Sequence, residues 1–396
     1  MKAGAHVTTM TRRSLLRAGA LAGLAAALPA GSAAARPAPA QCGSWPLWNA
    51  FVSRHIQPDG RVVDFLNADQ RSTSEGQSYA LFFALVANDQ VLFDKVLGWT
   101  RHNLCGGRPD LNLPAWLWGR DDSGSWRVLD ANTASDGELW IAYALLEAGR
   151  LWSRPGYVKA GQQILQLMRT QEVVALPGLG PMLLPGRSGF VEPGRWTLNP
   201  SYLPIQLLRR CANADPKGPW AAIAGNAARV LRESAPVGVA PDWTVWDGKA
   251  FGADPKRGNL GSYDAIRVYL WAGMLDAGEP LRARLLQDLS GPSDLLAAGT
   301  GFTEKTDTAR GVGSGALPVG FSAALLPYLS VRGQPALLKA QAQRIPAAAE
   351  PAAAALPYYE RTLALFGQGW LENRYRFAAD GRLLPAWRTP ACSANT

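Results

Sequence analysis

Three acidic residues each stand where an apolar stretch with helical periodicity begins. Glu75 ends a small polar run and precedes the apolar stretch 79–87, while Asp136 and Asp264 each follow a serine and open a later apolar stretch. Two positioned carboxyl groups are enough to hydrolyse a glycosidic bond: one donates a proton to the leaving oxygen, and the other attacks carbon or activates water. We therefore expect the three acids to converge on one cleft.

Simpler interpretations of the same acids remain open. Ser72 and Glu75 have the spacing of a capping box, which predicts only a capped helix. Asp264 and Arg267 are three positions apart, the spacing of an ordinary ion pair on a helix, and such a pair would keep Asp264 ionised. A helix start favours an ionised carboxyl. Glu75 could therefore act as an acid only if burial or a neighbour such as Asp136 raised its pKa.

The elements that must position these acids are helical nearly throughout the chain. The helices pair, and the first members of the pairs open near residues 75, 135, 201, 262, 318 and 356, at intervals of about sixty residues among the first four. Paired helices at a repeated interval predict an all-α, (α/α)6 barrel with six inner and six outer helices. The expected helices are 45–55, 75–88, 90–104, 135–152, 156–171, 201–213, 218–234, 263–275, 279–289, 318–330, 334–345 and 356–366.

Long loops at 105–134, 172–200 and 235–261 enter inner helices from one end of the barrel. Loops of this length are uncommon unless they have a function, and short hairpins within them remain possible. Their tryptophans suit stacking against sugar rings, although each one could instead anchor its loop. Tyr202, at the start of the helix 201–213, could reach the same cleft or could be a core residue. The loop tryptophans are Trp116, Trp118, Trp126, Trp196, Trp243 and Trp246.

The N-terminal residues 1–40 have the pattern of a cleaved export signal of the twin-arginine type. Arg12 and Arg13 precede an apolar stretch at 18–28, which is too short and too rich in alanine and glycine for a comfortable membrane span, and small residues follow at 38–40. This segment carries five basic residues and no acid, so its removal lowers the formal net charge from +9 to +4. No basic block that would indicate nucleic-acid binding is left, and 41–396 is expected to be one catalytic domain without a membrane span, located in the periplasm or secreted.

The cysteines and histidines limit other chemistry. Cys42 and Cys392 lie near the two ends of the mature chain and could form a disulfide bond in an oxidising compartment, whereas Cys105 and Cys211 are expected to be single thiols. The mature chain has only two histidines, which makes histidine triads and multi-histidine metal sites poor candidates. We expect neither a metal nor another cofactor.

Several motifs, in one order along nearly the whole mature chain, resemble glycoside hydrolase family 8. The resemblance rests on 74–79 (SEGQSY), 134–137 (ASDG) and 262–267 (SYDAIR), supported by 113–119, 177–186, 199–204 and 365–370. It implies an (α/α)6 barrel that hydrolyses β-1,4-glucan (cellulose) chains with inversion. The similarity to the enzymes that accompany bacterial cellulose synthase implies that complex as a partner.

The resemblance also implies a role for individual residues. Glu75 would be the proton donor, and either Asp136 or Asp264 the second carboxylate; for an inverting mechanism Asp264 is the better base, with Asp136 holding the sugar. An inverting pair is separated by roughly 6.5–9.5 Å. Glu138 stands where the family usually has Asp, which leaves any fine role of that position in doubt. The residues expected to bind substrate are Trp116, Trp118, Tyr202, Tyr263 and Arg267.

Two other functions remain open at this point. A hydrolase of the same fold could act on chitosan, xylan or mixed-linkage β-glucan, because the catalytic acids would be shared. A glycan-binding component of a cellulose-synthesis complex would need no catalytic acids, so the presence of Glu75, Asp136 and Asp264 together argues against it.

Overall fold

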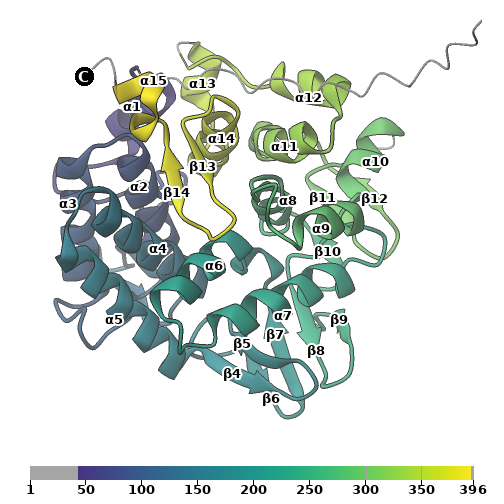
Figure 1. Cartoon of the computed structure of the whole chain (residues 1–396), viewed down its shortest axis with the longest axis horizontal. Coiled ribbons are helices and arrows are strands. Elements are labelled where there is room, and N and C mark those ends of the chain that lie inside the picture. Colours follow the sequence, from purple (N-terminus) through teal and green to yellow (C-terminus); the bar gives the residue numbers. More distant parts are fainter. Residues whose placement is uncertain (1–42, 300, 349, 394–396) are drawn as a thin grey trace, which may run out of the picture. The chain divides into compact units, whose positions relative to one another are not determined.

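The computed structural model describes residues 43–393, apart from 300 and 349. Helices connected by loops that carry short strands make up this part of the chain (Figure 1). The main helices are α1 (Pro46–His55), α2 (Ser74–Val86), α3 (Gln90–Trp99), α4 (Ser135–Leu151), α5 (Pro155–Gln171), α6 (Ile205–Ala214), α7 (Trp220–Glu233), α8 (Ile266–Gly273), α9 (Arg282–Asp288), α10 (Gly291–Ala297), α11 (Val319–Val331), α12 (Pro335–Ala342), α13 (Pro351–Ala355), α14 (Tyr358–Leu371) and α15 (Pro390–Ser393).

Burial distinguishes the inner helices α2 and α8 from the outer helix α5. Every residue of α2 from Gly76 to Val86 is buried, and so are all residues of α8, whereas α5 buries only Gly161, Leu165 and Met168. A helix that is apolar all round belongs inside a core, and a helix with one apolar stripe covers it. The inner helices α2, α4, α6, α8, α11 and α14 surround the centre in Figure 1, and each packs against an outer partner from the set α3, α5, α7, α9, α12 and α1. The predicted (α/α)6 barrel is confirmed.

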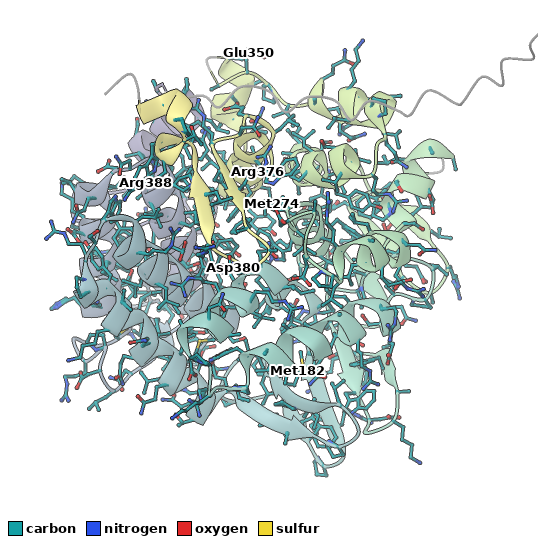
Figure 2. The ribbon with its side chains drawn as sticks, viewed as in Figure 1. Met182, Met274, Glu350, Arg376, Asp380 and Arg388 are labelled. Carbon is teal, nitrogen blue, oxygen red and sulfur yellow. The ribbon has the colours of Figure 1, made fainter. Side chains whose placement is uncertain are left out.

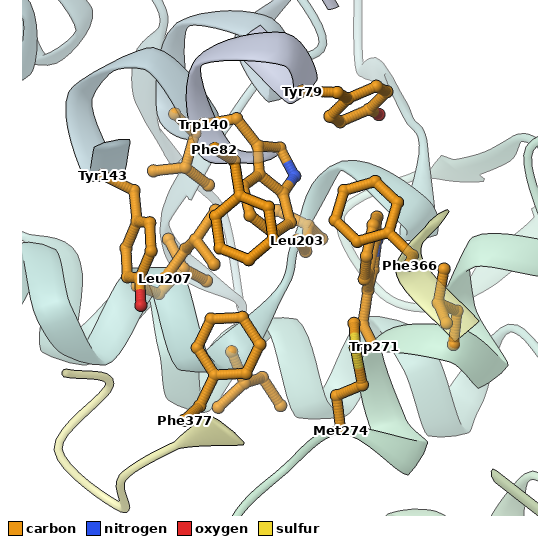
Figure 3. Packing of buried hydrophobic residues seen from close by; sticks show 14 of the residues in the cluster. Tyr79, Phe82, Trp140, Tyr143, Leu203, Leu207, Trp271, Met274, Phe366 and Phe377 are labelled. Carbon is orange, nitrogen blue, oxygen red and sulfur yellow. The ribbon is translucent and has the colours of Figure 1, made fainter. Parts of the chain in front are cut away.

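Large aromatic side chains fill the space between the inner helices (Figure 3). The ring of Phe366 on α14 lies 5.2 Å from that of Tyr79 on α2, 5.3 Å from Trp140 on α4 and 5.1 Å from Trp271 on α8, measured between centroids. Aromatic pairs at these separations stabilise the core beyond the area that they bury. One side chain thus contacts three other inner helices.

Glycines allow the inner helices to approach closely. A Cβ atom at Gly367 of α14 would lie 1.8 Å from the carbonyl oxygen of Ala323 on α11, and one at Gly273 of α8 would lie 2.3 Å from the backbone nitrogen of Tyr328. Neither distance is compatible with a side chain. The spacing of α8, α11 and α14 therefore depends on hydrogen at these two positions.

The long loops carry the short hairpins that the sequence left open. The strands β6 to β9 form one antiparallel sheet that joins the loops 172–200 and 235–261, with Trp196 paired to Trp246. The strands are β1 (Ser72–Thr73), β2 (Leu117–Arg120), β3 (Trp126–Asp130), β4 (Val173–Leu176), β5 (Gly180–Leu183), β6 (Val191–Glu192), β7 (Arg195–Leu198), β8 (Thr244–Trp246), β9 (Phe251–Ala253), β10 (Leu260–Gly261), β11 (Lys305–Asp307), β12 (Val312–Ser314), β13 (Tyr375–Phe377) and β14 (Leu383–Pro385).

A C-terminal hairpin of β13 and β14 fills one end of the barrel. The hydroxyl of Tyr143 donates to the carbonyl of Gly381 at 2.9 Å, and the backbone N–H of Leu383 donates to the carboxylate of Glu147 at 2.7 Å. Tyr143 and Glu147 lie in the second half of α4, whereas Asp136 lies at its start. The hairpin turn, which carries Asp380, lies near the middle of the ring of helices in Figure 2. The hairpin therefore covers the end of the barrel opposite Asp136.

Several expected helix bounds are wrong. The helix expected at 201–213 is a 3-10 turn (Pro200–Tyr202) followed by α6, because Pro204 has no N–H and disfavours helical geometry in the residue before it. The helix expected from 263 begins at Ile266, and the one expected at 90–104 gives way to a π-helical turn (Thr100–Leu104). The short helices α10, α13 and α15 and the C-terminal hairpin were not expected.

The export signal and Cys42 lie outside the described residues, so both expectations remain predictions. Cys392 is disulfide-bonded, and Cys105 and Cys211 are free and buried, as expected for single thiols. Among the helices of the described residues, none is long and apolar enough to cross a membrane.

Candidate active site

Glu75 is the second residue of α2, and its surroundings differ from the expected capping box. The cap is Thr73, whose hydroxyl accepts a hydrogen bond from the backbone N–H of Gly76 at 3.0 Å. Ser72 instead lies in β1 and donates to the carbonyl of Val62, so its proposed pairing with Glu75 is wrong. The neighbouring Ser74 hydroxyl donates to the Glu75 carboxylate at 3.2 Å. The hydroxyl cap of α2 is thus Thr73, and the Glu75 carboxylate has Ser74 as its side-chain partner.

Asp136 is the second residue of α4 and is buried, with 2% of its surface exposed. Its Oδ1 accepts a hydrogen bond from the N–H of Gly137 at 3.0 Å, while Oδ2 has no hydrogen-bond partner among the described residues. A Cβ atom at Gly137 would lie 2.7 Å from the Ser74 hydroxyl oxygen and 3.1 Å from the backbone nitrogen of Glu75. The starts of α2 and α4 therefore touch, which brings Glu75 and Asp136 to the same place.

Asp264 is linked to Asp136 by Arg267, which contacts both carboxylates. The Arg267 guanidinium donates from Nη2 to Asp264 Oδ1 at 2.7 Å, and the same nitrogen lies 3.7 Å from Asp136 Oδ2. Arg267 is only 7% exposed. Asp264 lies in the turn before α8 rather than inside a helix, so its expected pairing with Arg267 is present although the expected helix start is not. One buried cation thus joins Asp136 and Asp264.

Burial raises the pKa of both acids at the helix starts. Burial raises the pKa of Glu75, and the charge of Asp264 raises it further, against the opposing charge of Arg267. Burial raises the pKa of Asp136 well above its usual value, with the charge of Glu75 as the next cause. Two adjacent carboxyls cannot both ionise easily, which favours keeping a proton on the pair, as a general acid requires. The helix dipole alone would have favoured loss of that proton.

Tyr202 and Trp116 lie beside the three acids. Burial raises the pKa of Tyr202 well above its usual value, and the charges of Asp136, Glu75 and Asp264 raise it further. Its ring centroid is 5.7 Å from the Arg267 guanidinium carbon. The carbonyl of Trp116 accepts the N–H of Ser74 at 3.0 Å, so this tryptophan adjoins the start of α2.

Trp118 and Tyr263 lie at the edge of this group. The Trp118 ring stacks on Trp126 with centroids 5.2 Å apart and contacts Trp99 of the outer helix α3, while the Arg61 guanidinium lies 4.4 Å from its ring centre. Tyr263 is 42% exposed, and its hydroxyl donates to Glu304 at 3.3 Å. Neither side chain makes a hydrogen bond to any of the three acids.

The loop tryptophans do not all offer a face to a ligand. Trp246 is 1% exposed, and its indole N–H donates to the carbonyl of Pro177, so it anchors its loop and the expectation of a sugar platform is wrong for this residue. Trp243 is half-buried between Phe190, which is parallel to it at 5.9 Å, and Arg257. Trp126 is the most exposed, at 44%.

Glu138 is buried and has a second buried carboxyl, that of Glu172, near it. The Oε1 of Glu138 accepts the N–H of Ala134 at 3.4 Å, and burial followed by the charge of Glu172 raises the pKa of Glu138 well above the usual value. Glu172 is also buried and accepts the Thr133 hydroxyl at 2.5 Å. The two carboxyls therefore form a buried pair next to the start of α4.

Three residues of the site were not predicted individually, although Tyr79 and Ser201 lie in the motifs 74–79 and 199–204. The Ser201 hydroxyl accepts from Arg267 Nη2 at 2.8 Å, and the Tyr359 hydroxyl accepts from Arg267 Nη1 at 3.4 Å. The hydroxyl of Tyr79 is buried among the same charges without a hydrogen-bond partner in the described part of the chain. Tyr359 lies on α14, 92 positions after Arg267, so only the closed barrel brings the two together.

Comparison with known proteins gives the same family as the motifs of the sequence. The family model for glycosyl hydrolases family 8 matches residues 24–373. An endoglucanase of Xanthomonas axonopodis pv. citri (strain 306) is 86% identical over 387 residues, which cover 98% of this chain and 100% of that protein. An endoglucanase of Salmonella typhi is 45% identical and covers 89% of this chain and 94% of its own length.

The fold of a solved enzyme agrees with these matches. The crystal structure of an endo-1,4-D-glucanase from Vibrio fischeri ES114 superposes with a TM-score of 0.81 at 41% identity, covering 87% of this chain and 100% of that one. With the family model matched over most of the chain and the acids gathered at one end of the barrel, the protein belongs to family 8 of the glycosyl hydrolases.

Proposed function

We propose that this protein is an exported endo-β-1,4-glucanase, a cellulase that cleaves internal bonds of β-1,4-glucan chains with inversion at the anomeric carbon. The observation that carries the proposal is the cluster of Glu75, Asp136 and Asp264 around one buried arginine. The relatives named endoglucanases support the substrate class, because two of them match this chain over most of their length.

Glu75 is the proton donor in this proposal. A general acid must hold its proton at the working pH, and burial raises the pKa of Glu75. Breaking the bond needs that proton on the bridging oxygen, so that the leaving chain departs as an alcohol. The Ser74 hydroxyl donates to the Glu75 carboxylate and so helps to fix its orientation.

Asp264 is the base in this proposal. It keeps 27% of its side chain exposed, which leaves access for a water molecule, and Arg267 donates a hydrogen bond to its carboxylate at 2.7 Å. The base takes a proton from water as the oxygen attacks the anomeric carbon from the face opposite the leaving group. That single displacement inverts the configuration.

Asp136 and Tyr202 would hold the sugar ring at the point of cleavage. Asp136 Oδ2 has no hydrogen-bond partner in the described part of the chain, and a buried carboxyl oxygen of this kind is suited to accept a sugar hydroxyl. A bond that strengthens as the ring flattens would lower the barrier rather than only tighten binding. Trp116 and Trp118 would bind the neighbouring sugar units by stacking, and Tyr263 would contact the chain at the edge of the site.

The place of action is also part of the proposal. The twin-arginine pattern at 1–40 supports export to the periplasm or beyond, and the resemblance to enzymes that accompany cellulose synthase supports a role beside that complex. Cleavage of nascent glucan chains would then accompany their synthesis. Loss of cellulose output on deletion of the gene, restored by the wild type and not by Glu75→Gln, is the expected result in the producing cell.

The decisive measurement is release of reducing ends from carboxymethylcellulose. We expect wild type to be active and Glu75→Gln to lose activity by at least about 100-fold, since general acid catalysis contributes 10²–10⁴-fold. Glu192→Gln, which changes an exposed acid in the loop sheet, is the matched control. NMR of the first product should show the α-anomer.

Two outcomes would overturn parts of this proposal. Undiminished hydrolysis by Glu75→Gln would remove the proton donor, and a first-formed β-anomer would replace inversion with retention. Parallel assays on xylan, chitosan and mixed-linkage β-glucan decide the substrate, because faster cleavage of one of these would displace cellulose.

A further inference from the structure

Asp242 lies in the loop that precedes β8, and its buried carboxylate faces the turn before α8. Its Oδ1 accepts three backbone N–H groups, from Ser262 at 2.7 Å, Asp264 at 3.1 Å and Ala265 at 2.8 Å. Its Oδ2 accepts the hydroxyl of Ser262 at 2.5 Å. Asp242 is 8% exposed. One carboxylate therefore accepts hydrogen bonds from the backbone of Asp264 and of residues on both sides of it.

No side chain at the start of α8 caps the helix by accepting its first backbone N–H groups. The residue before the helix, Ala265, makes no side-chain cap, and free N–H groups at a helix start must find a partner. Asp242 supplies that partner from 22 positions earlier in the chain. Asp264 stands before the helix, where its carbonyl accepts the N–H of Arg267 at 3.1 Å and its own N–H has Asp242 as partner.

Side chains of α14 and of α8 itself also contact this turn. The Tyr359 hydroxyl on α14 donates to the carbonyl of Tyr263 at 2.7 Å, and Arg267 on α8 donates to the Asp264 carboxylate. The peptide between Tyr263 and Asp264 is thus held at its C=O by α14 and at its N–H by Asp242. Removal of Asp242 would free the N–H side alone.

We propose that Asp242 is a positioning residue that fixes the carboxylate of Asp264 for its reaction with water. This inference rests on the proposed function, in which Asp264 is the base. Asp242 makes no contact of its own with the cleaved bond, since its acceptors are occupied by the turn. Its loss should therefore lower kcat and leave KM nearly unchanged. A displacement of about 1 Å at a reacting group costs on the order of 100-fold in rate.

The test compares two substitutions at Asp242. Asp242→Asn keeps an oxygen for the three N–H groups, and its amide can donate to the Ser262 hydroxyl in place of the lost acceptor. Asp242→Ala removes every bond. On carboxymethylcellulose and on cellopentaose we expect kcat to fall about 100-fold in Asp242→Ala and less than about fivefold in Asp242→Asn, with KM within about twofold of wild type in both.

Controls separate positioning from general loss of structure. Asp247→Ala removes a carboxylate that accepts the N–H groups of Lys249 and Ala250 in the exposed turn after β8, and it should leave kcat unchanged. Thermal melting checks that each variant is folded. If Asp242→Ala does not fold, Asp242→Ser replaces it, because serine offers one oxygen that cannot reach all three N–H groups, and the same loss of kcat is expected.

Several results would overturn the inference. A folded Asp242→Ala with wild-type kcat would show that the turn holds Asp264 without it. A raised KM at unchanged kcat, or an equal loss of kcat in Asp242→Asn, would show that Asp242 acts in some other way. Asp264→Asn is measured beside them: if it retains full activity, the proposed base itself is wrong, whereas an inactive Asp264→Asn with an active Asp242→Ala refutes the positioning role alone.

Discussion

The buried pair of Glu172 and Glu138 next to the start of α4 gives a quantitative prediction for stability. Burial raises the pKa of Glu172 from 4.5 to about 8, although its bond from the Thr133 hydroxyl opposes this. In the unfolded chain the same carboxyl returns to its usual value. Replacement by glutamine, Glu172→Gln, removes the titrating group while keeping an oxygen that can accept the Thr133 hydroxyl.

The sign and size of the pH dependence of stability follow from the number of protons that the folded and the unfolded chain bind. Below pH 4.5 both the folded and the unfolded chain hold the proton of Glu172, and between pH 4.5 and about 8 only the folded chain holds it. The free energy of unfolding therefore falls as the pH rises through this window, by about 1.4 kcal/mol per pH unit for one proton. Over the whole window the loss is about 5 kcal/mol.

Urea unfolding at pH 5, 6, 7 and 8, followed by tryptophan fluorescence, measures this slope. Wild type should lose stability with rising pH more steeply than Glu172→Gln, so the difference between the two should grow toward pH 8 in favour of the variant. Glu350→Gln, at an exposed position labelled in Figure 2, is the control and should follow wild type. Parallel curves for wild type and Glu172→Gln would refute the assignment of a retained proton to this carboxyl.

Three further changes probe the site and the barrel. Arg267→Lys keeps the charge but cannot bridge Asp264, Ser201 and Tyr359 together, so kcat on carboxymethylcellulose should fall at least about tenfold, and wild-type kcat would contradict the bridge. Tyr202→Phe should lower kcat/KM without changing the urea midpoint, since only a hydroxyl among the acids is lost. Gly367→Ala should lower the free energy of unfolding by about 1–3 kcal/mol because its methyl group would strike α11, whereas Gly98→Ala, with open space around it, should be neutral or stabilising.

Local sequence determined the helices that are apolar on every side. The stretch 79–87 and the stretch 139–146 predict buried helices because no orientation would leave a polar face to water, and they became the inner helices α2 and α4. Glu75 and Asp136 were predictable for a related reason: each follows small polar residues at the start of such a helix. The repeat of about sixty residues then indicated the closed array.

Other features were decided by contacts between distant segments. Ser72 and Thr73 are equally good caps by residue type, and both lie in β1. The hydroxyl of Ser72 is engaged by Val62 and Arg61, which are distant from it in the chain, and Thr73 caps α2. Trp246 and Trp126 both look like loop aromatics in the sequence, yet one is buried against Pro177 and the other is exposed. Neighbouring residues in the chain carry no information about such choices.

In the active site, too, some features follow from local sequence and others only from contacts between distant segments. The sequence by itself determined which carboxyls are available and that Asp264 and Arg267 are close enough to pair. Only the tertiary structure decided that Arg267 also reaches Ser201 and Tyr359 and that Asp242 holds the turn before α8. The physical reason is that a helix start has unpaired N–H groups and a buried guanidinium has several donors, and both must be satisfied by whichever groups the closed barrel brings within hydrogen-bond distance.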